Sequence, residues 1–377
     1  MLNLKSPNVR SFRARKQMLA LETRGRGRDG LLAALAICQP AYTGIGWLRA
    51  RTLGPIDWEA WQGLWNKGIV CRSRFIRGNL GCVLREDMGL YLHAFSRGLS
   101  PTPSDVGSWI LSILKRHGTS TTDRIQADLH LTRSAVRKAL SDLGLRNLVM
   151  ETPRDTWALT EWEEPGVAHA SQAKSRARAE VVCRFLSTYG PATLREIADR
   201  FGWPTTQIQR VVGPLESART VIPCAVDASS DIRYVRAEDV KRISAARAVQ
   251  PFVSILDSFD PVVQAQKTEL AARYGWGCSI PSWWFYIFVN GEWRGAFRVH
   301  YKTKLLWIRE MILGKLLLAD GSLTREVFQE IRRLEAKPIR IDSMNGTPPH
   351  SPMNRRILEN QGYCMAEGSC FLPVAQD

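Results

Sequence analysis

The sequence predicts an α+β protein: tandem winged-helix domains, which are helix-turn-helix variants, followed by a β-rich C-terminal domain with an α/β tail. Three observations support this fold class. A unit of three short helices and a β-hairpin recurs about every 75 residues, which is too long a period for a solenoid and suits small domains in series. Strand-like patterns dominate after residue 250. A length of 377 residues is also sufficient for several such domains.

The clearest helix–hairpin unit is expected at 103–164. Ser104 is placed to cap its first helix, which Gly118 ends. A short second helix is expected at 122–129, and Thr132 is placed to cap a third helix with one apolar side. The strands of the hairpin are expected at 148–150 and 156–159. Three helices followed by a hairpin predict a winged helix, whose third helix enters the major groove of DNA.

Two further units are expected, at 29–102 and 176–245. In the later unit, the segment from Thr193 to Glu196 is a capping box that opens the second helix, and Pro204 begins the third. The earlier unit is more diverged. Its three helices and two strands are expected at 31–38, 42–51, 58–67, 70–76 and 80–84. The chain is therefore expected to hold three winged helices in series.

The β-rich C-terminal domain is expected at 250–377. The dipeptide Asn290-Gly291 lies between two apolar runs, which is a strong signal for a β-hairpin. The tail then alternates between helical and strand-like patterns. Its helix, strand, helix and final strand are expected at 324–336, 339–344, 353–361 and near 371.

The charge balance indicates an anionic partner. The chain carries 52 Lys and Arg residues against 36 Asp and Glu residues, a net charge of +16, with a pI of about 9.8. Hydrophobic residues make up 45% of the chain, so it is globular and not a disordered basic tail. Double-stranded DNA is the partner that suits both this charge and the helix–hairpin units.

Several other classes of protein are excluded by composition. No apolar run approaches the ~18–20 residues that span a bilayer, so we expect no membrane contact. The eight cysteines lack Cys-x-x-Cys pairs and the six histidines are scattered, so we expect no metal and no cofactor. Sparse cysteines and the lack of a secretion signal favour the cytoplasm, and there the nucleoid.

The first 28 residues are strongly basic, with eight Lys and Arg side chains against the single acid Glu22. Two interpretations fit this pattern. An organelle transit peptide has such a composition, and so has a flexible arm that lies along phosphates. We favour a basic N-terminal arm at 1–28.

Candidate DNA-binding residues lie on the predicted third helices and on one hairpin strand. Such side chains can contact DNA phosphates or base edges. Two other interpretations remain open: the residues form an ordinary charged, solvent-exposed helix face, or the winged helices dock proteins. Three basic side chains in the first unit alternate along a strand, which is either a track for phosphates or a solvated edge strand. The candidates are Arg72, Arg74, Arg77, Arg133, Arg137, Lys138, Thr205, Gln207, Gln209 and Arg210.

Several short segments resemble the AlkZ/YcaQ family of winged-helix DNA glycosylases. The segment 71–83, with Arg77-Gly78-Asn79-Leu80-Gly81, is similar to the family's Arg-Gly-Thr-Leu-His run after the first hairpin. The segment 35–39 resembles the helix that carries the catalytic Gln-x-Gln or Gln-x-Asp motif, and 258–263 resembles the Phe-Asp-Pro segment. The segment 288–295 is similar to the barrel hairpin of the family. The tail at 341–363 looks more like the C-terminal region of Lhr-type helicases.

The resemblance implies that the C-terminal domain is β-barrel-like. It also implies a DNA-repair enzyme that hydrolyses the N-glycosidic bond of alkylated or crosslinked purines, with Gln39 as a catalytic residue. Such a leaving group is already cationic, so the enzyme must only place a water and stabilise an oxocarbenium-like sugar. Two positions depart from the family pattern. The second polar residue of the motif is Ala41, and Gly81 stands where the family has histidine. A non-catalytic DNA-binding regulator or damage-recognition protein, or a protein–protein adaptor, are therefore the alternatives.

Overall fold

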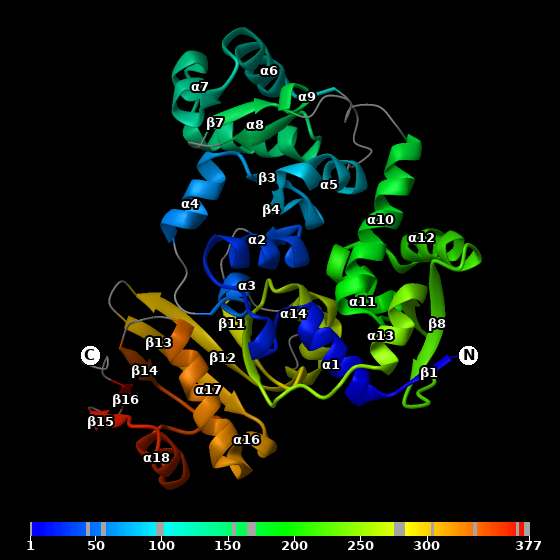
Figure 1. Cartoon of the computed structure of the whole chain (residues 1–377). Helices are drawn as coiled ribbons and strands as arrows, with labels where there is room; N and C mark the ends of the chain where they lie inside the picture. Colours follow the sequence, from blue (N-terminus) through cyan, green and yellow to red (C-terminus); the bar gives the residue numbers. More distant parts are fainter. Residues whose placement is uncertain are drawn as a thin grey trace.

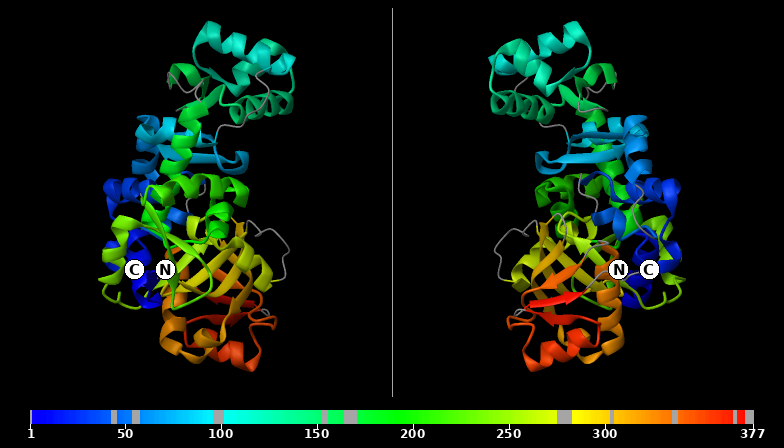
Figure 2. Two further views of the ribbon diagram at one scale, coloured as in Figure 1. Left: turned by 90° about the vertical axis from the view of Figure 1, so that its right-hand side faces the viewer. Right: turned by 90° about the vertical axis from the view of Figure 1, so that its left-hand side faces the viewer.

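The mixed α+β class is confirmed by the computed structural model (Figure 1). The molecule is elongated, with helices α6 to α8 at one end and α16 to α18 at the other (Figure 2). No helix in the described part of the chain is long and apolar enough to cross a membrane. The described residues are 2–42, 46–53, 58–95, 102–152, 156–163, 171–274, 283–302, 305–334, 338–366 and 369–372.

The basic N-terminal residues are folded, which corrects the prediction of a free arm. Strand β1 (Leu2–Leu4) pairs in parallel with β8 (Val221–Val226). Helix α1 (Ser6–Lys16) buries Val9 and Phe12, and the Arg15 side chain donates to the carbonyl of Arg247 (2.7 Å). The arginines of this segment alternate with apolar positions, so part of its charge serves to hold it against the body of the protein.

The first predicted unit contributes three helices and a hairpin, with one change. Residues 42–51 were predicted as one helix, but the chain forms strand β2 (Ala41–Tyr42) and the short helix α3 (Gly46–Arg49), because Gln39-Pro40 ends α2 and directs the next residues along β4. The remaining elements of this region are α2 (Gly27–Cys38), α4 (Trp58–Asn66), β3 (Val70–Arg74), β4 (Leu80–Leu84) and α5 (Met88–Phe95).

The helices, hairpin strands and helix caps expected within 103–164 are present. The hydroxyls of Ser104, Thr121 and Thr132 each accept a backbone N–H at the start of a helix. The buried positions of the third helix, such as Val136 and Leu140, form a core of their own with the first helix. The elements are α6 (Asp105–His117), β5 (Ser120–Thr121), α7 (Thr122–Leu129), α8 (Arg133–Leu145), β6 (Val149–Thr152), β7 (Thr156–Leu159) and α9 (Thr160–Glu163).

The hairpins of these two units share one sheet. Its six strands lie in the order β2-β4-β3-β6-β7-β5, and the junction is the antiparallel pairing of Arg72 with Glu151. Strand β3 therefore has a neighbour on both sides and is not the solvated edge strand that was one of the two interpretations of its arginines.

The third predicted unit contains a long first helix and a capped second helix. The Thr193 and Glu196 side chains form the predicted capping box, and Gly202 ends the second helix in the left-handed region (φ 68°). The elements are α10 (Ser171–Tyr189), α11 (Leu194–Phe201), α12 (Thr205–Ser217), β8, β9 (Arg233–Arg236) and α13 (Val240–Ser244).

The C-terminal region is built on a seven-stranded sheet in the order β10-β11-β12-β13-β14-β16-β15. Within the described residues β10 and β15 are its two edges, so this sheet is open where a barrel-like closure was predicted, because the tail adds β14 in parallel beside β13. The elements are β10 (Val253–Asp257), α14 (Pro261–Ala265), α15 (Lys267–Tyr274), β11 (Trp284–Val289), β12 (Glu292–Lys302), β13 (Leu305–Leu313), α16 (Lys315–Ala319), α17 (Gly321–Leu334), β14 (Ile339–Ile341), α18 (Pro352–Glu359), β15 (Cys364–Ala366) and β16 (Ser369–Leu372).

The two faces of this sheet have different neighbours. Phe285, Ile287 and Phe297 pack with Phe328 of α17 in one hydrophobic core. Tyr286 and its neighbours on the opposite face join a larger core that includes α14 and α10. Helix α14 thus lies between the C-terminal sheet and the third unit, and brings its N-terminus close to the end of α2.

Candidate functional site

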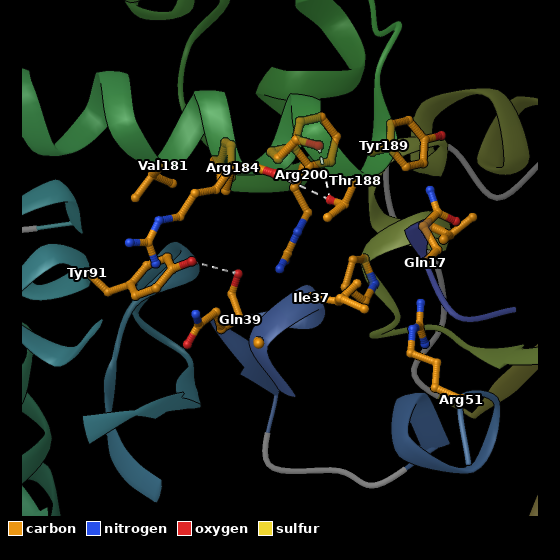
Figure 3. A pocket seen from close by; sticks show the side chains of 15 residues that line it. Gln17, Ile37, Gln39, Arg51, Tyr91, Val181, Arg184, Thr188, Tyr189 and Arg200 are labelled. Carbon is orange, nitrogen blue, oxygen red and sulfur yellow. Dashed lines mark hydrogen bonds between the residues drawn. The ribbon is translucent and has the colours of Figure 1, made fainter. Parts of the chain in front are cut away.

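A small pocket lies where α2, α10, α11 and α14 meet (Figure 3). Its volume is about 30 Å³, which is enough for one or two water molecules and too small for a nucleobase. The residues that line it are Gln17, Ala36, Ile37, Gln39, Arg51, Tyr91, Val181, Arg184, Phe185, Thr188, Tyr189, Arg200, Phe201, Pro261 and Val262.

Gln39 is placed at this pocket by the end of α2, where Pro40 stops the helix. The residue is buried, and the Tyr91 hydroxyl donates to its backbone carbonyl (3.2 Å; Figure 3). Its side-chain amide has partners at both ends. The amide nitrogen donates to the Asp87 carboxylate, and the amide oxygen accepts the backbone N–H of Leu84 (3.1 Å). The Gln39 side chain is therefore held in one orientation by groups outside the motif.

A chain of charged groups continues from this amide toward the surface. The guanidinium of Arg184 on α10 donates to Asp87 (2.6 Å) and to Glu180 (2.9 Å). Asp87 is 12% exposed and Arg184 40% exposed at the side chain, so the charge on the buried carboxylate is paired. Sequence reasoning missed this network because Asp87 and Arg184 are 97 residues apart and no local pattern joins them.

The two positions that depart from the family pattern lie next to each other in the sheet. Ala41 is buried in β2, beside the strand that carries Gly81. A Cβ atom at Gly81 would lie 3.1 Å from the Ala41 carbonyl oxygen and 3.2 Å from the Phe75 ring. The backbone is thus packed tightly where the family has a histidine, and the carboxylate beside Gln39 is Asp87.

Two buried arginines, Arg200 and Arg51, also line the pocket. Arg200 of α11 donates to the backbone carbonyls of Cys38 (2.8 Å) and Pro40 (3.2 Å), on either side of Gln39. Arg51 forms a salt bridge with Asp260 (2.5 Å and 3.1 Å), and both side chains are buried. Asp260 also accepts the Val262 N–H and so caps α14. Asp260, in the segment that resembles Phe-Asp-Pro, thus forms an ion pair that links α14 to the end of α3.

Asp257, close to this ion pair, gives a pH prediction. Burial, and then the charge of Asp260, raise the pKa of Asp257 to about 7, although the Phe259 N–H donates to its carboxylate. The unfolded value is about 3.9, so the folded protein holds this proton where the unfolded chain has lost it, and stability falls between about pH 4 and pH 7. We expect Asp257→Asn to remove that loss. Urea unfolding of both proteins at several pH values checks it, and equal slopes in this range would contradict it.

The predicted basic face of α8 is exposed. Arg133, Arg137 and Lys138 all point to solvent, and Arg133 forms a surface ion pair with Asp123 (3.3 Å). The unit that carries them, 103–164, has eight basic and nine acidic residues, so its positive charge is local to this face.

The three arginines of the first hairpin do not form one track. Arg72 stacks over Trp65 (4.2 Å), and Arg74 donates to the Gly78 carbonyl (2.9 Å), so both are half-buried. Arg77 lies beyond the strand, in a turn with φ 52°, and donates to the Asp199 carbonyl (3.1 Å). The three arginines were grouped because they alternate as in a strand, but strand β3 ends at Arg74.

The polar residues of α12 lie at its N-terminal half. Gln209 and Arg210 are exposed, whereas the Gln207 amide oxygen accepts from the Arg178 guanidinium (2.7 Å). Thr205 lines a surface hollow together with Arg77. The structure thus brings together one predicted residue from the first unit and one from the third, and places the α8 residues outside this hollow. Among the described residues no group of His, Cys, Asp or Glu side chains could hold a metal ion.

The comparisons with known proteins agree with the resemblance found in the sequence. Residues 99–277 match the model of the family described as DNA glycosylase AlkZ-like. The structure of the Streptomyces sahachiroi DNA glycosylase AlkZ has a similar fold: TM-score 0.67, 15% identity, 90% of this chain and 100% of that chain. The DIP2311 protein of Corynebacterium diphtheriae is 16% identical over 35% of this chain and 26% of its own, with a TM-score of 0.15. No curated protein matches the sequence.

Proposed function

We propose that the protein binds double-stranded DNA and acts in its repair, because residues 99–277 match the model of the AlkZ-like family of DNA glycosylases. The single observation that carries this proposal is the family match, which covers the second and third helix–hairpin units and extends to the Asp260 loop. The net charge of +16 and the exposed basic face of α8 agree with it.

In this proposal the three helix–hairpin units, at 29–102, 103–164 and 176–245, act as winged helices. The third helices, α8 and α12, contact the duplex. Arg133, Arg137 and Lys138 have the exposure that phosphate contacts need, and Gln209 and Arg210 have it on α12. The partly buried Arg72 and Arg74 serve the sheet, while Arg77 with Thr205 forms a second point of contact.

The reaction proposed is hydrolysis of the N-glycosidic bond of an alkylated or crosslinked purine. The alkylated base leaves without an acid, so the protein has to place a water and stabilise positive charge on the sugar. Gln39 is the candidate for this role. Asp87 supports this role because its carboxylate accepts from the amide nitrogen of Gln39 and fixes the amide. The Leu84 N–H uses one of the two lone pairs of the amide oxygen, which leaves the other for a water.

Incubation with duplex DNA that carries N7-alkylguanine tests this reaction. We expect abasic sites with the wild type, and a fall in rate of about 100-fold or more in Gln39→Ala, since one group that stabilises a developing charge contributes about that much. Gln62→Ala, at an exposed position of α4, is the matched control. Product formation that survives in Gln39→Ala would refute the assigned site. Thermal unfolding of each variant separates loss of fold from loss of chemistry.

A second candidate function is a non-catalytic DNA-binding or damage-recognition protein on the same scaffold. One observation favours it: both ends of the Gln39 amide already have protein partners, and position 41 offers only a methyl group. Tight binding of the alkylated duplex without any abasic product would support this function over the enzyme. If the protein is instead a protein–protein adaptor, its affinity for DNA should be undetectable or should not change with salt concentration, because it makes no phosphate contacts.

A further inference from the structure

Helix α10 carries two cations that have no acidic partner within the described part of the protein. Lys174 and Arg178 lie one helical turn apart, so their side chains share a face. Arg178 has neutral partners: it donates to the Ala94 carbonyl (3.0 Å) and lies over the Trp203 ring (5.2 Å). The Lys174 ammonium forms no hydrogen bond or ion pair with another described residue. The positive charge of this face is therefore not neutralised by the protein.

This arrangement is unfavourable for the folded protein on its own. Both side chains are half-buried, and burial lowers the pKa of each, while the charge of Arg178 lowers the pKa of Lys174 further. Lys174 also lies in the first turn of α10, where the helix dipole disfavours a cation, and that turn holds no acidic residue. An anion beside the pair would offset all three effects, so the arrangement indicates an anionic ligand.

Gln207 adds a third donor and restricts the ligand. It lies in the first turn of α12, and its amide oxygen accepts from the Arg178 guanidinium (2.7 Å). Because the oxygen is engaged, only the amide nitrogen, which is a donor, is left for a ligand. A glutamine that reads adenine needs both groups, since it forms two hydrogen bonds with the base edge. The three side chains therefore offer donors only, as a phosphate requires, and Gln207 is not placed to read adenine.

We propose that Lys174, Arg178 and Gln207 form a contact site for one backbone phosphate of bound DNA. Helix α10 packs against both α5 and α12 (Figure 1), and Arg178 bonds to each of these neighbours, so its guanidinium is held in place before DNA arrives. This inference rests on DNA binding as proposed above, but not on glycosylase activity. It adds the long helix of the third unit to α8 and α12 as part of the surface that positions the duplex.

Lys174→Gln is the decisive variant, because it removes a charge without removing a contact between described residues. We expect it to bind a duplex about tenfold more weakly at about 0.1 M salt and to lower the slope of log K against log salt concentration by about one. Its midpoint of thermal unfolding should stay the same or rise by about 1 °C, since an unfavourable cation is gone. Fluorescence anisotropy and thermal unfolding measure the two effects.

The matched control is Arg176→Gln. Arg176 is exposed two residues further along the same helix, so it points to a different face, and its loss changes the net charge equally. We expect its affinity and salt slope to stay close to those of the wild type. Equal losses in the two variants would assign the effect to net charge and overturn the proposal.

Lys174→Glu separates DNA binding from stability most strongly. A glutamate four residues before Arg178 forms an ion pair along the helix and suits the first turn, so the thermal midpoint should rise above that of the wild type. Affinity for DNA should nevertheless fall by on the order of 100-fold, because the new charge repels the phosphate and neutralises Arg178. A fall in both quantities would mean that Lys174 supports the fold, and would overturn the proposal.

Two further measurements identify the ligand. Inorganic phosphate is titrated at constant ionic strength and followed by thermal shift. If it stabilises the wild type but not Lys174→Gln, while both bind DNA equally, the site takes free phosphate and the DNA assignment is overturned. A wild type without any salt-dependent binding of DNA would refute the proposed function and this inference with it. Normal binding by Lys174→Gln, beside a wild type that binds DNA, would overturn this inference alone.

Discussion

Asp260→Asn is expected to lower the free energy of unfolding by about 3–5 kcal/mol, because it leaves the Arg51 guanidinium buried without its counter-charge. Asparagine is as good an N-cap as aspartate, so the cap of α14 is retained and the change isolates the charge. Urea unfolding followed by far-UV circular dichroism measures the effect. The ion pair also joins α14 to the end of α3, so we expect the first unit and the C-terminal sheet to lose stability together.

The matched control for this substitution is Glu359→Gln on α18. It breaks an exposed ion pair with Arg355 (2.7 Å), whose two side chains are 60% and 48% exposed, and should change stability by less than about 1 kcal/mol. A loss in Asp260→Asn as small as that in the control would show that the buried pair contributes nothing beyond a surface pair.

Replacement of Arg133, Arg137 and Lys138 of α8 by glutamine is expected to weaken binding of double-stranded DNA by on the order of 100-fold at about 0.1 M salt. Each phosphate contact releases counterions, so the slope of log K against log salt concentration should fall by about one for each residue removed. Fluorescence anisotropy of a labelled duplex over a range of salt concentrations gives both quantities.

The control for α8 removes the same charge at the other end of the molecule. Arg325, Arg355 and Arg356 are exposed on α17 and α18, and their replacement by glutamine should leave the slope nearly unchanged. If the two triple variants lose affinity equally, binding depends on the net charge of +16 and not on the face of α8.

The local features of the fold could be predicted from the sequence because local interactions determine them. Ser104 and Thr132 cap helices through contacts within three residues, and the capping box at Thr193 is equally local. The hairpin at Asn290-Gly291 forms because both residues adopt the positive φ that its turn requires (53° and 78°).

The candidate site was predicted only in part, because its contacts are long-range. Gln39 was found through a motif, but its partner Asp87 lies 48 residues away and Arg184 lies on another unit. The shared six-stranded sheet was missed for the same reason, since a single cross-strand pair at Arg72 joins two units that look separate in the sequence.

The pairing of β1 with β8 has a consequence for how the chain folds during synthesis. Leu2 pairs with Cys224, so the first strand leaves the ribosome more than 200 residues before its partner exists. At about 5–20 residues per second, the N-terminal strand and helix α1 wait roughly 10–40 s with their apolar sides unprotected. The third unit is completed only when the beginning of the chain returns to it. Strand β1 and helix α1 can therefore pack against the third unit only after that unit has been synthesised, although they precede it in the chain.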